Sequence, residues 1–280
     1  MENDDLPVVS VLMTTYNREN YVASAIDSVL ASTFEDFELV VVDDCSKDRT
    51  SEICREYASQ DDRVHFFQNE KNLGDYPNRN RAASYARGRY LKYLDSDDML
   101  YPHGLAVMVS TMERFTDAKA GLSAYAEADR PHPCVYSPLE AYRIHYFERD
   151  LLGRAPGSVI VNRKAFESVG GFSGKRQVGD HELWLKLAAK YSVVTMPRDL
   201  VWDRDHEVKE SHADSIGEKA FMHQEILVAA LEHDDCPLSQ SARTEARQRL
   251  KALRKRQLIG AVKRGQFADA LVLGKCLRIL

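Results

Sequence analysis

Two clusters of aspartates occur in the sequence, each directly after a short apolar run. Asp43-Asp44 follow residues 37–42, and Asp95-Ser96-Asp97-Asp98 follow residues 89–94. Two carboxylates at a strand end can bind one hard divalent cation and leave positions open for phosphate oxygens and water. Such a cation would neutralise a diphosphate leaving group. The alternative is that these aspartates cap the following helices, since Asp is favoured in turns and at N-caps.

The elements that would position these carboxylates follow an α/β pattern. Short β-branched runs alternate with helical stretches over the first hundred residues, which is typical of parallel strands joined by helical crossovers. We expect strands at 8–13, 37–42, 64–68 and 89–94, and helices at 17–31, from 48, and at 77–86. Ligands bind at the carboxyl edge of such sheets, so the two aspartate clusters are expected to meet there.

The pattern is weaker after Pro102. Helices are expected at 103–115 and 180–190, and strands at 121–125 and 158–162. Residues 126–152 contain three prolines and many aromatics without a clear period, so we expect a mixed or mobile region there. From residue 215 onward the chain is expected to be helical.

The segment after the first expected strand, Thr14-Thr15-Tyr16-Asn17-Arg18-Glu19, contains no glycine. A dinucleotide-binding fold would carry G-x-G-x-x-G at this position. A pyrophosphate would therefore need another means of binding, and a metal ion is the candidate. The place of Asp43-Asp44 is similar to that of the acidic residue that holds a ribose hydroxyl in nucleotide-binding α/β folds.

Five sequence blocks, in this order and spacing, resemble the family 2 inverting glycosyltransferases of GT-A fold. They are Thr14 to Asn17, the segment 41–50, Asn72-Leu73-Gly74 with Asn80, the segment 93–98, and Gly170-Gly171-Phe172 followed by 180–185. The resemblance spans roughly residues 7–212 and implies a Rossmann-like, mostly parallel central sheet flanked by helices. We expect a catalytic domain over 1–214 and a basic helical C-terminal extension over 215–280.

The resemblance implies transfer of a sugar from a nucleoside diphosphate sugar, most often a UDP-sugar, to an acceptor hydroxyl with Mn²⁺ or Mg²⁺ present. It places the donor against Thr14, Thr15, Tyr16, Asp43, Asp44, Arg79 and Asp95, with Asp43 reaching the base. It assigns the metal to Asp95 and Asp97, joined by His206 of the Arg204-Asp205-His206 segment. Imidazole and carboxylate together suit Mn²⁺ somewhat better than Mg²⁺.

The resemblance makes Asp180 the general base. A sugar hydroxyl is a poor nucleophile, so a carboxylate must accept its proton as it attacks the anomeric carbon, and direct displacement inverts the configuration. Asp180 opens the expected helix, whose positive end would keep the carboxylate ionised. Gly179 stands where the family usually has an acidic residue, so His181 or Glu182 could take the role instead.

The basic charge of the chain is confined to its tail. Residues 241–280 contain 11 Lys or Arg and two acidic residues, although the net charge of the chain is −5. Such helices could lie on an anionic membrane beside a lipid-linked glycan acceptor. Alternatively, they could dock on the catalytic domain or on a second subunit, as in a homodimer. Nucleic acid is not expected as a partner, because the rest of the chain is acidic.

The setting expected from these features is the cytoplasm, with peripheral contact at the inner face of the membrane and a role in bacterial surface polysaccharide assembly. The start of the chain, residues 1–6, is acidic rather than basic and apolar, and the five cysteines include no C-x-x-C pair. Two rival functions remain. A sugar nucleotidyltransferase should carry a Gly-rich loop with a basic residue after the first strand, which is missing here. A catalytically silent relative that binds nucleotide or glycan as a partner subunit is suggested by Gly179.

Overall fold

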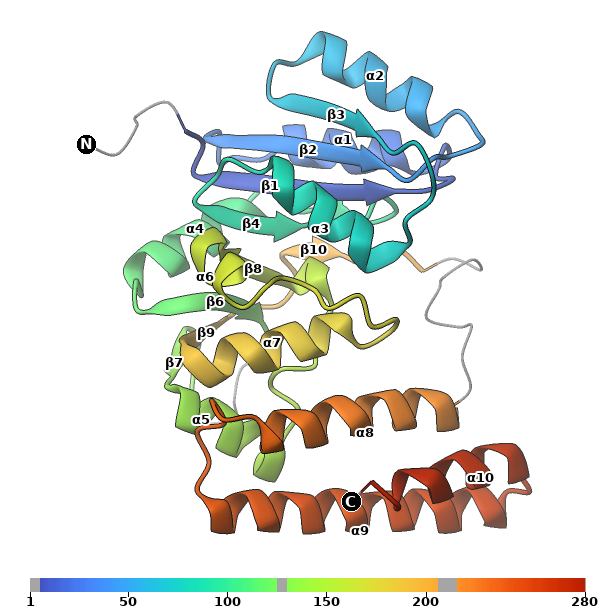
Figure 1. The fold of residues 1–280 in the computed structure, drawn as a ribbon. Helices are drawn as coiled ribbons and strands as arrows, with labels where there is room; N and C mark the ends of the chain where they lie inside the picture. Colours follow the sequence, from blue (N-terminus) through green and yellow to red (C-terminus); the bar gives the residue numbers. More distant parts are fainter. Residues whose placement is uncertain (1–5, 125–129, 206–215, 280) are drawn as a thin grey trace.

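The computed structural model describes residues 6–124, 130–205 and 216–279. Its centre is an eight-stranded sheet of order β3-β2-β1-β4-β8-β6-β9-β7 (Figure 1). Helices cover both faces of this sheet, and three further helices follow at the C-terminal end. The expected α/β class with a large central sheet and a C-terminal helical segment is therefore confirmed.

The N-terminal half of the sheet is parallel, as the alternating pattern predicted. Its strands are β1 (Val9–Thr15), β2 (Phe37–Asp43), β3 (Val64–Gln68) and β4 (Tyr90–Tyr93). They are joined by α1 (Val22–Leu30), α2 (Thr50–Gln60) and α3 (Asp75–Tyr85). Because β1 lies between β2 and β4, the segments after these three strands meet at one edge.

The other half of the sheet is mixed. β8 (Val159–Asn162) runs antiparallel to both β4 and β6 (Ala118–Ser123), whereas β9 (Ser192–Met196) runs parallel to β6. The helices here are α4 (Gly104–Arg114), α6 (Arg163–Ser168) and α7 (Gly179–Lys190), with a 3-10 turn η2 (Pro156–Ser158) before β8. A separate antiparallel pair joins β5 (Met99–Leu100) to β10 (Val201–Trp202).

The sheet separates two apolar cores. Val9, Val11 and Met13 of β1 pack with α1, α2 and α4, whereas Leu12 packs on the opposite face with α3, α6 and α7. Since both faces are covered, β1 and β2 read as nearly continuous apolar runs in the sequence. Trp184 is 1% exposed in the core that contains Leu12, which supports the expectation that its helical spacing marks a core residue.

The region 126–152 was expected to be mixed or mobile, and its described part, residues 130–152, is mixed. This part holds β7 (Cys134–Tyr136), α5 (Pro138–Arg143) and a π-helical turn η1 (Ile144–Glu148). Ser137 and Glu140 form a capping box at the start of α5, and the hydroxyl of the buried Tyr142 donates to the Leu185 carbonyl at 3.0 Å. Each element has three to six residues, too few to show a period.

The C-terminal segment consists of α8 (Ile216–Glu232), α9 (Gln240–Lys263) and α10 (Phe267–Cys276). Ile226 and Leu231 of α8 belong to the same apolar core as Trp184, so α8 packs directly beneath α7. The second half of α9 instead forms a small core of its own with α10 and the start of α8, centred on Ala261 and Leu273. Among the described residues, no helix is both long and apolar enough to cross a membrane.

A lysine is buried in the centre of the sheet. Lys92 of β4 is 0% exposed, and its Nζ donates to the carbonyl oxygens of Tyr93 and Gly157. Burial lowers the pKa of Lys92 to about 7, although the nearby Asp95 and Asp98 oppose this shift. The unfolded chain keeps this proton up to about pH 10.

Between these two pKa values the unfolded state binds one more proton at Lys92, so the free energy of unfolding should rise with pH. The expected slope is about 1.4 kcal/mol per pH unit. Urea unfolding of the native chain and of Lys92→Met, at about pH 7.5 and about pH 9, measures it. Equal slopes in the two proteins would contradict the prediction.

Candidate active site

The carboxyl ends of β1, β2 and β4 open onto a cavity of about 590 Å³. Its described lining is polar and comes from these strand ends, from the start of α3 and from the segment after β10. The lining includes Thr14, Thr15, Tyr16, Arg18, Asp44, Asn72, Gly74, Asp75, Asn78, Arg79, Asp95, Ser96, Asp97, Asp98 and Asp203. The two aspartate clusters therefore meet at the sheet edge as predicted.

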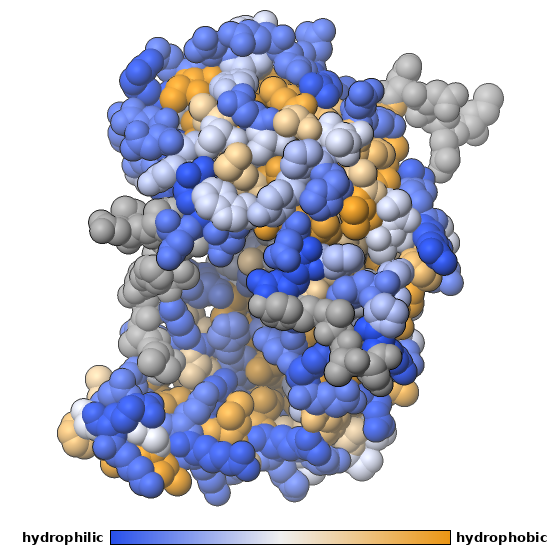
Figure 2. All heavy atoms as spheres, turned by 180° about the vertical axis from the view of Figure 1, so that it is seen from behind, coloured by the Kyte–Doolittle hydropathy of each residue, from blue (hydrophilic) through white to orange (hydrophobic). Residues whose placement is uncertain are grey.

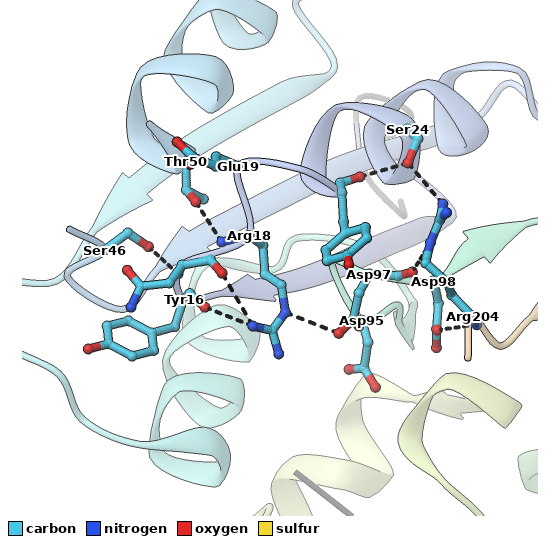
Figure 3. A network of polar contacts seen from close by, with 12 residues as sticks. Tyr16, Arg18, Glu19, Ser24, Ser46, Thr50, Asp95, Asp97, Asp98 and Arg204 are labelled. Carbon is cyan, nitrogen blue, oxygen red and sulfur yellow. Dashed lines mark hydrogen bonds and ion pairs between the residues drawn. The ribbon is translucent and has the colours of Figure 1, made fainter. Parts of the chain in front are cut away.

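The segment 95–98 is held in place by two arginines (Figure 3). Arg18 Nε donates to Asp97 Oδ2 at 3.0 Å, which pairs the loop after β1 with the loop after β4. Arg204 donates from its backbone N–H to Asp98 Oδ1 at 3.0 Å and from Nε to the Asp97 carbonyl at 2.9 Å. The carboxylates of Asp97 and Asp98 are thereby fixed within one short turn.

The carboxylates of this turn differ in pKa. Burial raises the pKa of Asp98 to about 7, and the neighbouring charge of Asp95 adds to the shift. Burial acts in the same direction on Asp95, but the charge and hydrogen bond of Arg79 outweigh it and lower its pKa. Asp95 is therefore ionised at neutral pH, whereas Asp98 is partly protonated there. Mutual repulsion of this kind is relieved when a divalent cation binds between the carboxylates.

Asp43 is the last residue of β2 and Asp44 follows it, and the two side chains have different surroundings. Asp43 is fully buried, and its carboxylate accepts from Ser51 Oγ at 2.6 Å, from Gln68 Nε2 at 3.1 Å and from the Ser46 backbone N–H at 3.1 Å. The described wall of the cavity does not include Asp43, and its contact with the base stays a prediction. In this structure Asp43 shapes the turn to Ser46.

Asp44 is the carboxylate of the pair that faces the cavity. It accepts from the backbone N–H groups of Leu73 at 2.8 Å and Gly74 at 2.9 Å. Gly74 has a φ of +86°, a conformation that L side chains rarely adopt. Asp44 thus anchors the turn that begins α3, the helix that carries Arg79.

Arg79 lies at the centre of the site. It is 7% exposed, and its guanidinium pairs with Asp75 at 2.7 Å and with Asp95 at 2.7 Å. Its remaining nitrogen, Nη1, is buried without a hydrogen-bond partner among the described residues, as is Thr15 Oγ1 at the end of β1. Both residues line the cavity. Unpaired buried polar atoms are costly, so these two groups fit an anionic, hydrogen-bonding ligand such as a nucleoside diphosphate.

A second cavity of about 480 Å³ adjoins the first and contains Asp180. The two cavities share Gly74, Asp75, Arg79 and Asp95 as lining residues. Asp95 and Arg79 therefore form a common wall, with Asp97 on one side and Asp180 on the other. Acidic groups from distant parts of the chain thus line two adjoining cavities.

The structure distinguishes the three candidates for the base. Of these, Asp180 lines the shared space, whereas His181 points to His145 and Glu182 pairs with Lys175 at 2.7 Å. Gly179 precedes Asp180 because a Cβ there would lie 2.8 Å from the Tyr76 ring. The missing acidic residue is thus explained by the packing of Tyr76, which donates a hydrogen bond to the Asp180 carboxylate.

Burial raises the pKa of Asp180. The His181 backbone N–H, which donates to Asp180 Oδ1 at 2.7 Å, the Tyr76 hydroxyl and the charge of Arg79 oppose this shift without cancelling it. The carboxylate is therefore a stronger base than an exposed aspartate, rather than the weaker one that the helix N-terminus alone would produce. A raised pKa suits proton abstraction from a hydroxyl.

Several residues of the site were not predicted from the sequence, and one prediction falls outside it. Arg18, Asp75 and Asp203 line the cavity without having been singled out. Arg18 could have been found from the sequence, because it directly follows the Thr14 to Asn17 block. No feature of the sequence pointed to Asp203. His206 lies outside the described residues, so its role stays a prediction.

The fold and this site define a GT-A glycosyltransferase. S. aureus TarS 1–349 in complex with UDP-GlcNAc has the same fold, with a TM-score of 0.68 at 20% identity over 85% of this chain and 70% of that one. The mannosyltransferase PcManGT from Pyrobaculum calidifontis, in complex with GDP-Man and Mn²⁺, superposes with a TM-score of 0.63 at 20% identity over 96% and 79%. Residues 10–170 match the model of glycosyl transferase family 2, and the chain belongs to this family.

Relatives with higher identity align over shorter stretches of the chain. An uncharacterized glycosyltransferase of Methanocaldococcus jannaschii, MJ1057, is 40% identical over 115 residues, which is 40% of each chain. The Escherichia coli enzyme WfgD, a UDP-Glc:alpha-D-GlcNAc-diphosphoundecaprenol beta-1,3-glucosyltransferase, is 38% identical over 105 residues, 38% of this chain and 41% of its own. The chain thus matches about two fifths of the length of these relatives.

Proposed function

We propose that the chain is an inverting glycosyltransferase that moves a sugar from a nucleoside diphosphate sugar, a UDP-sugar foremost, to a hydroxyl of a growing glycan. One observation carries the proposal. A cavity lined by carboxylates and unpaired polar groups shares the wall formed by Asp95 and Arg79 with a second cavity that contains Asp180. The first cavity suits the donor and the second suits the acceptor.

The donor diphosphate would lie against Arg79, whose unpaired Nη1 donates to it, with the nucleoside toward Thr14, Thr15, Tyr16 and Asp44. Asp95 and Asp97 would hold a divalent cation, with His206 as the further ligand that the family resemblance suggests. Two carboxylates beside open space match the oxygen donors that Mn²⁺ and Mg²⁺ accept. When bound, this cation offsets the negative charge that develops on the departing diphosphate.

Asp180 would act on the acceptor. Its carboxylate accepts the proton of the attacking hydroxyl while that oxygen bonds to the anomeric carbon and the bond to the diphosphate breaks. Attack from the face opposite the diphosphate inverts the configuration. Tyr76 and the His181 backbone N–H hold the carboxylate oxygens in place during this transfer.

The experiment measures release of nucleoside diphosphate from a panel of UDP-, GDP- and dTDP-sugars, with and without Mn²⁺. A donor that is bound should also raise the midpoint of thermal unfolding, by several degrees at about 100 times its dissociation constant. Turnover of at least one UDP-sugar that depends on the cation supports the proposal. Binding of donors without any release of diphosphate, across acceptor glycans, would instead favour the catalytically silent relative.

We further propose that α9 and α10 contact an anionic membrane, where a lipid-linked acceptor is available. Leu253, Ile259, Val262, Phe267 and Leu271 are 44% to 72% exposed, and they lie among the Lys and Arg residues of this segment. Figure 2 shows apolar atoms exposed between hydrophilic ones at this end of the molecule. WfgD, by its name, acts on a diphosphoundecaprenol-linked sugar.

Cosedimentation with vesicles tests this contact. The chain should bind vesicles rich in phosphatidylglycerol and release them at high salt, since each basic residue near the surface adds about 1 kcal/mol. Phe267→Glu with Leu271→Glu should weaken the binding about tenfold or more, because both apolar contacts are replaced by charges that the lipid repels. Equal binding to neutral vesicles would contradict the electrostatic part, and unchanged binding of the double variant would contradict the apolar part.

A further inference from the structure

A second cluster of potential ligand atoms lies behind the first turn of α7, on the side away from Asp180. His145 of the π-helical turn, Asp150 of the following loop and His181 of α7 each offer one ligand atom, and these atoms lie within 4.8 Å of one another. His181 and the His145 side chain are 5% and 4% exposed. Neither the proposed donor site nor the proposed acceptor site uses this cluster.

We propose that His145, Asp150 and His181 bind one transition-metal ion of the Zn²⁺ class, with water in the fourth position, at a site that is separate from Asp95 and Asp97. The Nε2 atoms of His145 and His181 are 3.1 Å apart. Two nitrogens on a tetrahedral zinc ion, each at 2.0–2.1 Å, stand about 3.3 Å apart. The two rings are thus already spaced as a ligand pair, and they meet edge to face at 88°.

The donor set has the chemistry of a zinc site. Two imidazoles and one carboxylate are ligands that Zn²⁺ prefers, whereas an all-oxygen set would favour Mg²⁺ or Ca²⁺. His181 is buried, and its Nε2 faces the Nε2 of His145. Asp150 is a carboxylate at neutral pH, because its bonds with His145 and Gly153 outweigh burial and lower its pKa.

Outer partners fix the orientation of the ligands. His223 of α8 places its Nδ1 3.2 Å from His181 Nδ1, on the ring nitrogen opposite to Nε2. The Gly153 backbone N–H donates to Asp150 Oδ1 at 2.7 Å and orients this carboxylate. Hydrogen bonds to the second nitrogen of a ligating histidine are typical of metal sites. A π-helical turn at His145 is also typical of functional positions.

Such an ion would join three elements that are distant in the sequence: η1, α7 and, through His223, the C-terminal helix α8. It would also fix the first turn of α7, where the His181 backbone N–H holds Asp180. This last consequence rests on the proposed function, whereas metal binding itself does not.

The test uses the full chain, freed of metal with a chelator, and Co²⁺ as a spectroscopic substitute for Zn²⁺. The native chain should show the visible absorption of a four-coordinate, nitrogen-ligated Co²⁺ ion, and Zn²⁺ should abolish it by displacement. His145→Ala should lose this band. Asp97→Asn and His103→Ala, which change the carboxylate site and an exposed histidine, should keep it. Zn²⁺ should raise the midpoint of thermal unfolding of the native chain by roughly 5 °C.

A second variant keeps the test decisive if His145→Ala does not fold. The Asp150 side chain is 64% exposed, so Asp150→Asn should fold and should weaken Zn²⁺ binding about tenfold or more. Absence of the Co²⁺ band in the native chain, or a band unchanged in both variants, would overturn the proposal. The three imidazoles would then form only a chain of hydrogen bonds. Because these readouts do not use sugar transfer, they are independent of the proposed reaction.

Discussion

Replacing Asp180 with Asn is expected to lower kcat by about 10³-fold, the scale typical of general base catalysis. The substitution keeps the size of the side chain and one oxygen for the Tyr76 hydroxyl, but the amide cannot accept the proton of the acceptor hydroxyl. Donor binding, measured as the thermal shift produced by UDP-sugar with Mn²⁺, should change little. The measurement is the initial rate of nucleoside diphosphate release at saturating donor and acceptor.

Glu182→Gln is the matched control, since Glu182 lies on the same helix turn but pairs with Lys175 outside the shared cavities. It should retain kcat within about a factor of three. Because burial raises the pKa of Asp180, the rate should fall as the pH drops through that raised value, where the base becomes protonated. Asp180→Asn should lack this acid limb. A variant as active as the native chain would remove Asp180 from the mechanism.

Replacing Asp97 with Asn is expected to lower the metal-dependent turnover by about 10³-fold, which corresponds to about 4 kcal/mol of transition-state stabilisation. The amide retains the shape of the side chain but loses the charge that attracts the cation. Chelation of the cation should depress the native enzyme by a similar factor. The ratio of rates with and without Mn²⁺ is the quantity to compare, and it should fall toward one in the variant.

Arg18→Gln separates loss of the cation from loss of the ion pair between Arg18 and Asp97. This variant also breaks the 3.0 Å contact but leaves the carboxylate in place. It should therefore keep its response to Mn²⁺, even if its affinity for the donor falls. If Asp97→Asn responds to Mn²⁺ as the native chain does, the assignment of this carboxylate to the metal is wrong.

The parallel half of the fold could be predicted from the sequence because its central strands β1 and β2 have seven residues each and are buried on both faces. The first and last residues of the helices depended on contacts with distant parts of the chain. The helix expected from residue 77 begins at Asp75, because Asp44 holds the preceding turn through Leu73 and Gly74. β9 was not predicted, since residues 192–196 follow α7 directly without a glycine or proline to mark a break.

The candidate site could be predicted at the level of segments but not of individual side chains. The sequence places Asp43 and Asp44 together at the end of a strand, and only the register of β2 decides that Asp43 is buried while Asp44 faces the cavity. Arg79 was a weak candidate, because its two carboxylate partners lie four and 16 residues away.

The histidine cluster carried no signal in the sequence. His145, His181 and His223 are separated by 36 and 42 residues, far from any metal-ligand spacing. The segment that presents His145 also lacked a recognisable period. These residues are brought together by the packing of η1 and α8 on α7, which cannot be inferred from local patterns.

The position of Ile226 and Leu231 bears on how the chain can be shortened. A fragment ending at residue 214 would uncover the side of α7 that α8 covers, and would expose apolar area on the helix that carries Asp180. Cys236, Leu238 and Ala246 continue the same core into α9. An autonomous catalytic unit should therefore be sought with its C-terminus beyond Ala246, where α9 leaves this core for the small one around Ala261.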